Sequence, residues 1–159
     1  MTGLSHLDRN GSAVMVDVSD KPATRRQAQV QCVLQLSAEA FEAIQAHRVA
    51  KGEALTVAKL AGLHAAKRTD ELIPLCHPLP LEHLEMVFEP DEATHTIRLM
   101  AQATTTAKTG IEMEAFMAAA IGALALYDMI KSLDPGATIS ELQLVRKTGG
   151  KQGFERSLG

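Results

Sequence analysis

The chain is poor in aromatic side chains. Of its 159 residues only 3% are aromatic, tryptophan is absent, and Tyr127 is the single tyrosine. Proteins that bind single-stranded nucleic acid stack the bases on such rings, so this class of partner is not expected. The formal net charge of -3 also lacks the strong positive excess of a general nucleic-acid binder, although it leaves room for a local basic pocket.

Cysteine is scarce as well. Cys32 and Cys76 are the only two, and their spacing predicts no disulfide framework. The N-terminus lacks the positive start and apolar run of a signal peptide, which predicts a cytoplasmic protein. The most apolar stretch, residues 116–130, is too short and too rich in alanine to predict a membrane span. The length favours one catalytic domain at 14–159, preceded by a flexible polar tail at 1–13.

Hydrophobic periodicity predicts the order strand, two helices, strand, strand, helix, strand. Strands are expected at 26–36, 83–89, 95–104 and 138–146, and helices at 37–47, 53–69 and 111–133. This order is that of a ferredoxin-like βαββαβ sandwich, an α+β fold with helices on one face of an antiparallel sheet.

The middle of the long helix, residues 115–126, is apolar on almost every side. A helix without a polar face is buried on more than one side, and a single sheet covers only one of them. We therefore expect a subunit interface to supply the second cover, which makes the protein a homo-oligomer.

The segment Leu72–Leu79 reads LIPLCHPL and holds Cys76 and His77 between Pro74 and Pro78. The residue before a proline is pushed out of the α region, so the segment is expected to form an extended loop of rigid shape. Such a loop presents the imidazole of His77 for chemistry.

A metal site is the alternative interpretation of this region. Four side chains of ligating type lie near one another in the sequence, namely His64, Cys76, His77 and His83. Neither an HExxH pattern nor paired CxxC spacing is present, so no metal ligand is predicted.

Charged residues flank both ends of the long helix. Lys108, Glu112 and Glu114 lie before and within its first turn, where the helix dipole favours anions and where backbone N–H groups can bind phosphate. Asp128 and Lys131 share one face near its end. At 1.5 Å per residue, Glu114 and Asp128 are separated by roughly 21 Å along the axis. Either the two groups serve opposite ends of a long substrate, or one site is shared between two chains.

Basic residues gather at the ends of the expected elements. They are Lys21, Arg25, Arg26, Lys51, Lys67, Arg68, Lys147 and Lys151. In a mildly acidic protein this placement indicates a polyphosphate pocket. No GxxxxGK[ST] run occurs, so a P-loop is excluded, and the glycine-rich KTGGKQG segment is weak evidence by itself.

Seven segments resemble, in order, the cyclic pyranopterin monophosphate synthase family, the C proteins of molybdenum cofactor biosynthesis. They are MVDVS (15–19), KGE (51–53), AGLHAAKRT (61–69), LIPLCHPL (72–79), KTGIEMEAF (108–116), YDMIK (127–131) and KTGGKQG (147–153). The resemblance implies a lyase that converts 3′,8-cyclo-7,8-dihydroguanosine 5′-triphosphate to cyclic pyranopterin monophosphate and diphosphate. It also implies a ferredoxin-like fold and hexamers, built as trimers of dimers, with sites at the dimer interface.

The resemblance further implies roles for individual residues. Asp128 matches the family's catalytic residue, and Lys51 and Lys131 match its essential lysines. No cofactor is expected, although Mg²⁺ could accompany the triphosphate, and a transient contact with the upstream radical enzyme is implied. The alternatives are a non-catalytic ligand-sensing module and a metal-dependent hydrolase. The expected substrate-binding residues are Leu75, Cys76, His77, Met113, Glu114, Asp17, Lys21, Arg26, Lys147, Glu112 and Lys108.

Overall fold

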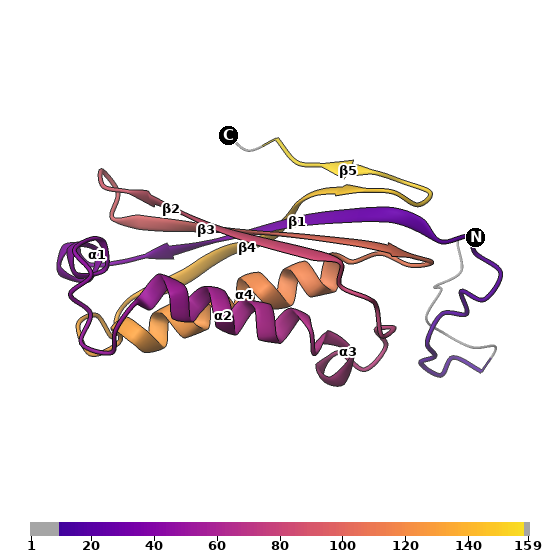
Figure 1. Ribbon diagram of the computed structural model, residues 1–159, viewed down its shortest axis with the longest axis horizontal. Helices are drawn as coiled ribbons and strands as arrows, with labels where there is room; N and C mark the ends of the chain where they lie inside the picture. The colour runs from indigo at the N-terminus through magenta and orange to yellow at the C-terminus, as the bar shows by residue number, and fades with distance from the viewer. Residues whose placement is uncertain (1–9, 158–159) are drawn as a thin grey trace.

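The structure of the protein is a computed structural model that describes residues 10–157. Within these residues one sheet has five strands in the order β2-β3-β1-β4-β5, and every neighbouring pair is antiparallel (Figure 1). The strands are β1 Thr24–Gln35, β2 His83–Asp91, β3 Thr96–Ala107, β4 Thr138–Thr148 and β5 Phe154–Glu155. The four long strands confirm the predicted ones, whereas the short β5 was not predicted.

Helices cover one face of this sheet. The helices α2 Ala54–Ala66 and α4 Glu112–Ile130 lie against it, and the shorter α1 Ala38–Gln45 lies at one end (Figure 1). As predicted, α1 begins after Ser37, whose hydroxyl oxygen accepts a hydrogen bond from the backbone N–H of Ala40 at 3.3 Å. The α+β class with an antiparallel sheet is therefore confirmed.

Several predicted boundaries were wrong. The helix expected at 53–69 ends at Ala66, and a separate turn of helix, α3 Thr69–Leu72, follows it. The break is stabilised by the buried hydroxyl of Thr69, which donates to the carbonyl oxygen of Ala66 at 3.0 Å. Of the tail expected at 1–13, residues 1–9 lie outside the described part of the chain, and residues 10–13 are exposed.

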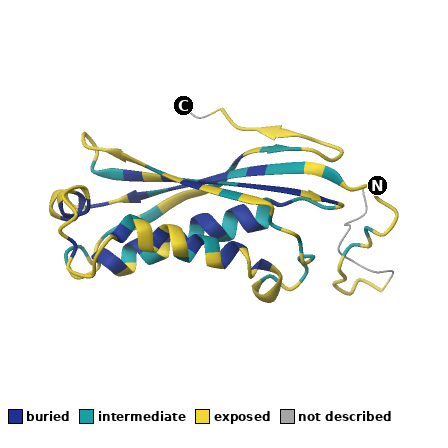
Figure 2. Ribbon diagram, viewed as in Figure 1, coloured by how far each residue is buried: buried dark blue, intermediate teal, exposed yellow. Residues whose placement is uncertain are grey.

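The core lies between the sheet and the helices (Figure 2). Every second residue of β1, namely Ala28, Val30, Cys32 and Leu34, is at most 1% exposed, which is the alternation that the sequence predicted. The same pattern leaves the intervening residues of β1 on the face of the sheet that the helices do not cover.

The second cover of α4 is α2 of the same chain, which corrects the expectation that a subunit interface would supply it. A β-carbon added to Gly62 would lie 2.7 Å from the carbonyl oxygen of Ala118, and one added to Gly122 would lie 3.3 Å from that of Ala58. The two helices thus approach backbone to backbone. Large apolar side chains still remain exposed on the two helices, namely Val57 and Leu60 of α2 and Leu124 of α4.

By length and composition α4 could cross a membrane, since it has 19 residues and a mean hydropathy of 1.5. The helix is longer than the stretch 116–130, on which the expectation of no membrane span was based. Half of its apolar window is buried inside the structure, and the core helix of a water-soluble protein passes the same test. We take its apolar character to reflect packing against the sheet and α2.

Candidate active site

The charged side chains of α4 form two separate groups within one chain. Asp128 lies near its last turn with Lys51 and Lys131. Glu112 and Glu114 lie in its first turn, beside the loop that carries Cys76 and His77 and beside the ends of β1, β3 and β4. The rise of a helix places the two groups roughly 21 Å apart. A single chain therefore does not bring Lys51 and Lys131 to His77.

The group at the last turn is a lysine pair around one carboxylate. The ammonium of Lys51 donates to the carboxylate of Asp128 at 2.9 Å and to its backbone carbonyl at 2.6 Å, which caps the end of α4. The ammonium of Lys131 lies 2.6 Å from the other carboxylate oxygen. Hydrogen bonds from Lys131 and Lys51 lower the pKa of Asp128 to about 2, and Asp128 in turn raises the pKa of Lys131. All three groups are exposed to solvent, so a ligand can reach them.

At the first turn of α4 the loop 73–82 lines one side of a cavity. The imidazole of His77 is held by a 2.8 Å hydrogen bond from its Nε2 to the backbone carbonyl of Val16, which makes Nε2 the protonated nitrogen. The hydroxyl of Thr105 donates to the carbonyl of Pro80 at 2.6 Å and ties the loop to β3. The cavity has a volume of about 450 Å³. Seven of the expected substrate-binding residues line it, namely Lys21, Leu75, Cys76, His77, Glu112, Met113 and Glu114.

Glu114 is the unusual group of this cavity, because its side chain is buried and only 4% of the residue is exposed. Burial raises the pKa of Glu114 to about 7, and the nearby carboxylates of Glu112 and Asp70 add to the rise. Burial also raises the pKa of the Cys76 thiol. Near neutral pH the carboxyl group of Glu114 can therefore both give and take a proton.

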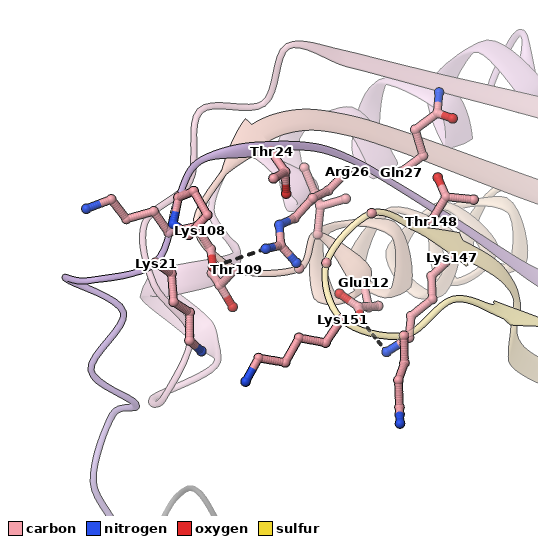
Figure 3. Close-up of a pocket in the computed structure, with 16 residues that line it drawn as sticks. Lys21, Thr24, Arg26, Gln27, Lys108, Thr109, Glu112, Lys147, Thr148 and Lys151 are labelled. Carbon is pink, nitrogen blue, oxygen red and sulfur yellow. Dashed lines mark hydrogen bonds and ion pairs between the residues drawn. The ribbon is translucent and has the colours of Figure 1, made fainter.

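A larger cationic pocket adjoins this cavity (Figure 3). It has a volume of about 920 Å³, and Lys21, Thr109, Gly110 and Glu112 line both spaces. Its basic side chains come from segments far apart in the sequence and are Lys21, Arg26, Lys108, Lys147 and Lys151. The only acidic side chain that lines it within the described residues is Glu112, which accepts a hydrogen bond from Lys147 at 3.0 Å. This arrangement suits a ligand with several negative charges.

The segment before β1 helps to form the pocket wall. The ammonium of Lys108 donates to the carbonyl of Ser19 at 2.7 Å and fixes this segment to the loop after β3. Asp17 lies in the same segment but lines neither space, and its carboxylate accepts from the backbone N–H and the hydroxyl of Ser19 at 2.8 and 2.7 Å. Those hydrogen bonds lower the pKa of Asp17. Asp17 is thus the one expected substrate-binding residue that the structure sets apart from both spaces.

Some residues of the pocket were not among the expected site residues. Lys151 had been noted only as a basic residue beside two glycines, Thr109 only as part of the segment before the long helix that could bind phosphate, and Thr24 and Gln27 had not been predicted as site residues. The KTGGKQG segment was the available signal for Lys151. Thr24 and Gln27 carry no pattern that distinguishes them from other strand residues.

The side chains considered as metal ligands do not gather. Among residues 10–157 no group of three or more His, Cys, Asp and Glu side chains is placed to hold a metal ion. In particular, the Nε2 of His77 is engaged with a backbone carbonyl.

An α+β domain with a cationic pocket at one end of its longest helix and a lysine–carboxylate group at the other has the charge arrangement of proteins that bind polyanionic small molecules. Comparison with known proteins identifies the family to which the chain is similar. The model of the MoaC family matches residues 15–150. The cyclic pyranopterin monophosphate synthase of Thermomicrobium roseum is 46% identical over 156 residues, which are 98% of this chain and 94% of that protein.

Two further relatives indicate the same family. The cyclic pyranopterin monophosphate synthase of Nostoc sp. is 49% identical over 150 residues, covering 94% of this chain and 89% of that protein. The human protein called molybdenum cofactor biosynthesis protein 1 is 44% identical over 155 residues, which are 97% of this chain but 24% of the human protein. The chain therefore belongs to the MoaC family.

Proposed function

We propose that this chain is a cyclic pyranopterin monophosphate synthase of molybdenum cofactor biosynthesis. It converts 3′,8-cyclo-7,8-dihydroguanosine 5′-triphosphate to cyclic pyranopterin monophosphate and releases diphosphate, as a phosphorus–oxygen lyase. The family match over residues 15–150 and the relatives of this name at 46% and 49% identity support the proposal.

The observation that carries the substrate class is the cationic pocket. Five basic side chains converge on a space of about 920 Å³, and the one carboxylate that lines it in the described part of the chain is that of Glu112. A triphosphate brings three to four negative charges, which arginine and lysine N–H groups bind with strong charge-assisted hydrogen bonds. The adjoining cavity beside Glu114 and His77 offers mostly apolar walls and a few polar groups, which suits the ring system of the same ligand.

We further propose that two copies of the chain share each site, and that the protein is a homohexamer built as a trimer of dimers. The separation of the two charged groups along α4 supports sharing, because one small substrate cannot reach both groups on one straight helix. A two-fold axis across α4 would bring the first turn of one copy to the last turn of the other. The exposed apolar side chains of Val57, Leu60 and Leu124 are available for such contacts.

In this arrangement Lys51, Lys131 and Asp128 carry the proton transfers that open the imidazole ring and close the pyrazine ring. The ion pairs already place the two ammonium groups at one carboxylate, so a proton can pass between them through the substrate. His77 and Glu114 orient the ring that becomes the pterin.

Lys21, Arg26 and Lys147 of a second copy hold the phosphates during the last step. A substrate hydroxyl attacks the α-phosphorus, a new oxygen–phosphorus bond forms, and the bond to the β-phosphate breaks. The diphosphate that leaves carries the released charge, which these cations stabilise. Leu75, Cys76, Met113, Glu112 and Lys108 complete the substrate-binding set, with Asp17 supporting it from the segment before β1.

The remaining expectations are part of the same proposal. The strand order β2-β3-β1-β4, with helices between β1 and β2 and between β3 and β4, supports a ferredoxin-like core. Residues 14–159 form one catalytic domain in the cytoplasm. The proposal includes no cofactor, and any Mg²⁺ bound to the triphosphate would belong to the substrate. A transient contact delivers the intermediate from the upstream radical enzyme.

Turnover of the cyclic triphosphate tests the proposal directly. The purified chain should release diphosphate and form the cyclic monophosphate, detected by a coupled diphosphate assay and by mass spectrometry. Lys51→Ala and Lys131→Ala should each abolish product while far-UV circular dichroism shows an intact fold. Absence of diphosphate release by the wild type would reject the activity, and near-normal turnover by both variants would reject the roles of the lysines.

A further inference from the structure

The glycine-rich turn after β4 lines the cationic pocket, and the proposed function assigns it no role. Lys147 still pairs with Phe154 across β4 and β5, so the chain must reverse between these two residues. Gly149 and Gly150 lie in that reversal with φ of +84° and +76°. These are left-handed conformations, which glycine adopts at little cost and other residues rarely adopt.

The turn lies directly against Arg26. Gln27 pairs with Thr148 at the end of the β1–β4 ladder, so the next residues of the two strands, Arg26 and Gly149, meet beyond it. A β-carbon on Gly149 would lie 3.2 Å from the Cα of Arg26 and 2.3 Å from the backbone oxygen of Arg25. A β-carbon on Gly150 would lie 2.4 Å from the terminal Nη1 of Arg26. The guanidinium therefore occupies space that any residue other than glycine would fill.

A second loop holds the other side of the guanidinium (Figure 3). The Nε of Arg26 donates to the carbonyl of Ala107 at 3.0 Å, and Nη2 donates to the carbonyl of Lys108 at 3.3 Å. Within residues 10–157, Nη1 makes no hydrogen bond, and it is this nitrogen that faces Gly150. The two hydrogen bonds of Nε and Nη2 thus fix the orientation of the Arg26 guanidinium in the cationic pocket and leave Nη1 available to a ligand.

We propose that the Gly149–Gly150 turn is the positioning element for Arg26. By lacking β-carbons, the two glycines let the guanidinium pack between the turn and the carbonyls of Ala107 and Lys108, with its remaining N–H groups available to a polyphosphate. The identity of this ligand as the triphosphate of the substrate rests on the proposed function. The positions of Arg26 and of the turn are independent of that function.

Gly150→Ala is the informative substitution. Its methyl group meets the flexible tip of Arg26, so the guanidinium moves and the strands stay in place, whereas a methyl group on Gly149 would meet the backbone of Arg25. Gly11→Ala is the matched control, because Gly11 has φ of +79° and no atom within 4 Å of the added carbon. Gly11→Ala therefore introduces the same unfavourable positive φ at a residue with a side chain, without contacting Arg26. Gly150→Asn serves as a second variant that tolerates a positive φ and carries the same β-carbon.

The test measures binding of inorganic tripolyphosphate to the full-length protein by isothermal titration calorimetry. We expect Gly150→Ala, or Gly150→Asn if the alanine variant does not fold, to weaken binding about tenfold or more, and Gly11→Ala to leave it unchanged. On an Arg26→Ala background the Gly150 substitution should add less than about twofold, because the group that it displaces is already gone. With the cyclic triphosphate, the loss should appear mainly in KM.

Three results would overturn the inference. They are equal tripolyphosphate affinity of the Gly150 and Gly11 variants, multiplicative effects of the Gly150 and Arg26 substitutions, and absence of tripolyphosphate binding by the wild type. Failure of the proposed function is distinguishable, because a wild type that binds tripolyphosphate but releases no diphosphate from the cyclic triphosphate would reject the activity and leave the binding comparison valid.

Discussion

Replacing Glu114 by glutamine should remove a pH dependence from the stability of the protein. The carboxyl group of Glu114 has a pKa of about 7 in the folded chain, against an ordinary value of 4.5, because it is buried. Between these two values the folded chain binds more protons than the unfolded chain. Stability therefore falls as the pH rises from about 4.5 to about 7, and the loss is complete above that range.

The size of the effect follows from the shift. A shift of one pKa unit corresponds to 1.36 kcal/mol, so ionised Glu114 costs the folded state roughly 3 kcal/mol at pH 8. Glutamine has nearly the same shape and no charge at any pH. Relative to the wild type, Glu114→Gln should gain roughly 3 kcal/mol in the free energy of unfolding between pH 4.5 and pH 8.

Urea denaturation of both proteins at several pH values, at one protein concentration, measures this difference. Titrations elsewhere in the chain are common to the two proteins and cancel in the comparison. If the free energies of unfolding of the two proteins changed in parallel with pH, Glu114 would not be the buried acid described here. The same variant should lose activity, since Glu114 lies in the cavity assigned to the ring of the substrate.

Three further predictions concern packing and charge. Gly62→Ala should lower the free energy of unfolding, measured in urea, by about 1–3 kcal/mol, because α2 and α4 must move apart. Gly136→Ala is the control and should change it little, because the atom nearest to the added β-carbon lies 3.5 Å away; equal effects of the two substitutions would contradict the helix packing. The pKa of Asp128 near 2 predicts no inflection from this group in kcat between pH 4 and 8, whereas Asp128→Asn should lower kcat at least about 100-fold; an active variant would exclude its catalytic role. Glu112→Gln should strengthen binding of inorganic tripolyphosphate several-fold by calorimetry, because Lys147 loses its carboxylate partner. Unchanged or weaker binding would show that the ion pair does not compete with phosphate for Lys147.

Much of the fold could be predicted because periodicity is a local property. The alternation along β1 and the serine before α1 each determine local structure from neighbouring residues alone. The packing of α2 on α4 could not be predicted in the same way. The sequence indicated that α4 is buried on two sides. Which element covers the second side depends on the close approach of α2 and α4 at Gly62 and Gly122.

The same distinction between local and long-range structure applies to the candidate site. The separation of Glu114 and Asp128 followed from the rise of one helix, and both lie on α4 near its opposite ends. The convergence of Arg26, Lys108 and Lys147 depends on the register of β1 with β3 and β4, which a single sequence does not specify. For this reason the basic residues could be recognised as a set while their common pocket could not be located.

Mixing two inactive variants tests most directly whether two copies share each site. One variant carries Lys131→Ala, and the other carries Arg26→Ala together with Lys147→Ala. If each site takes its lysine–carboxylate group from one copy and its phosphate-binding group from another, subunits that are dissociated, mixed and reassembled should regain about a quarter of the wild-type rate, since half of the dimers are mixed and each of these has one intact site. Reassembled mixtures that stay inactive, although mixed oligomers form, would place both groups of a working site on the same chain and contradict the account.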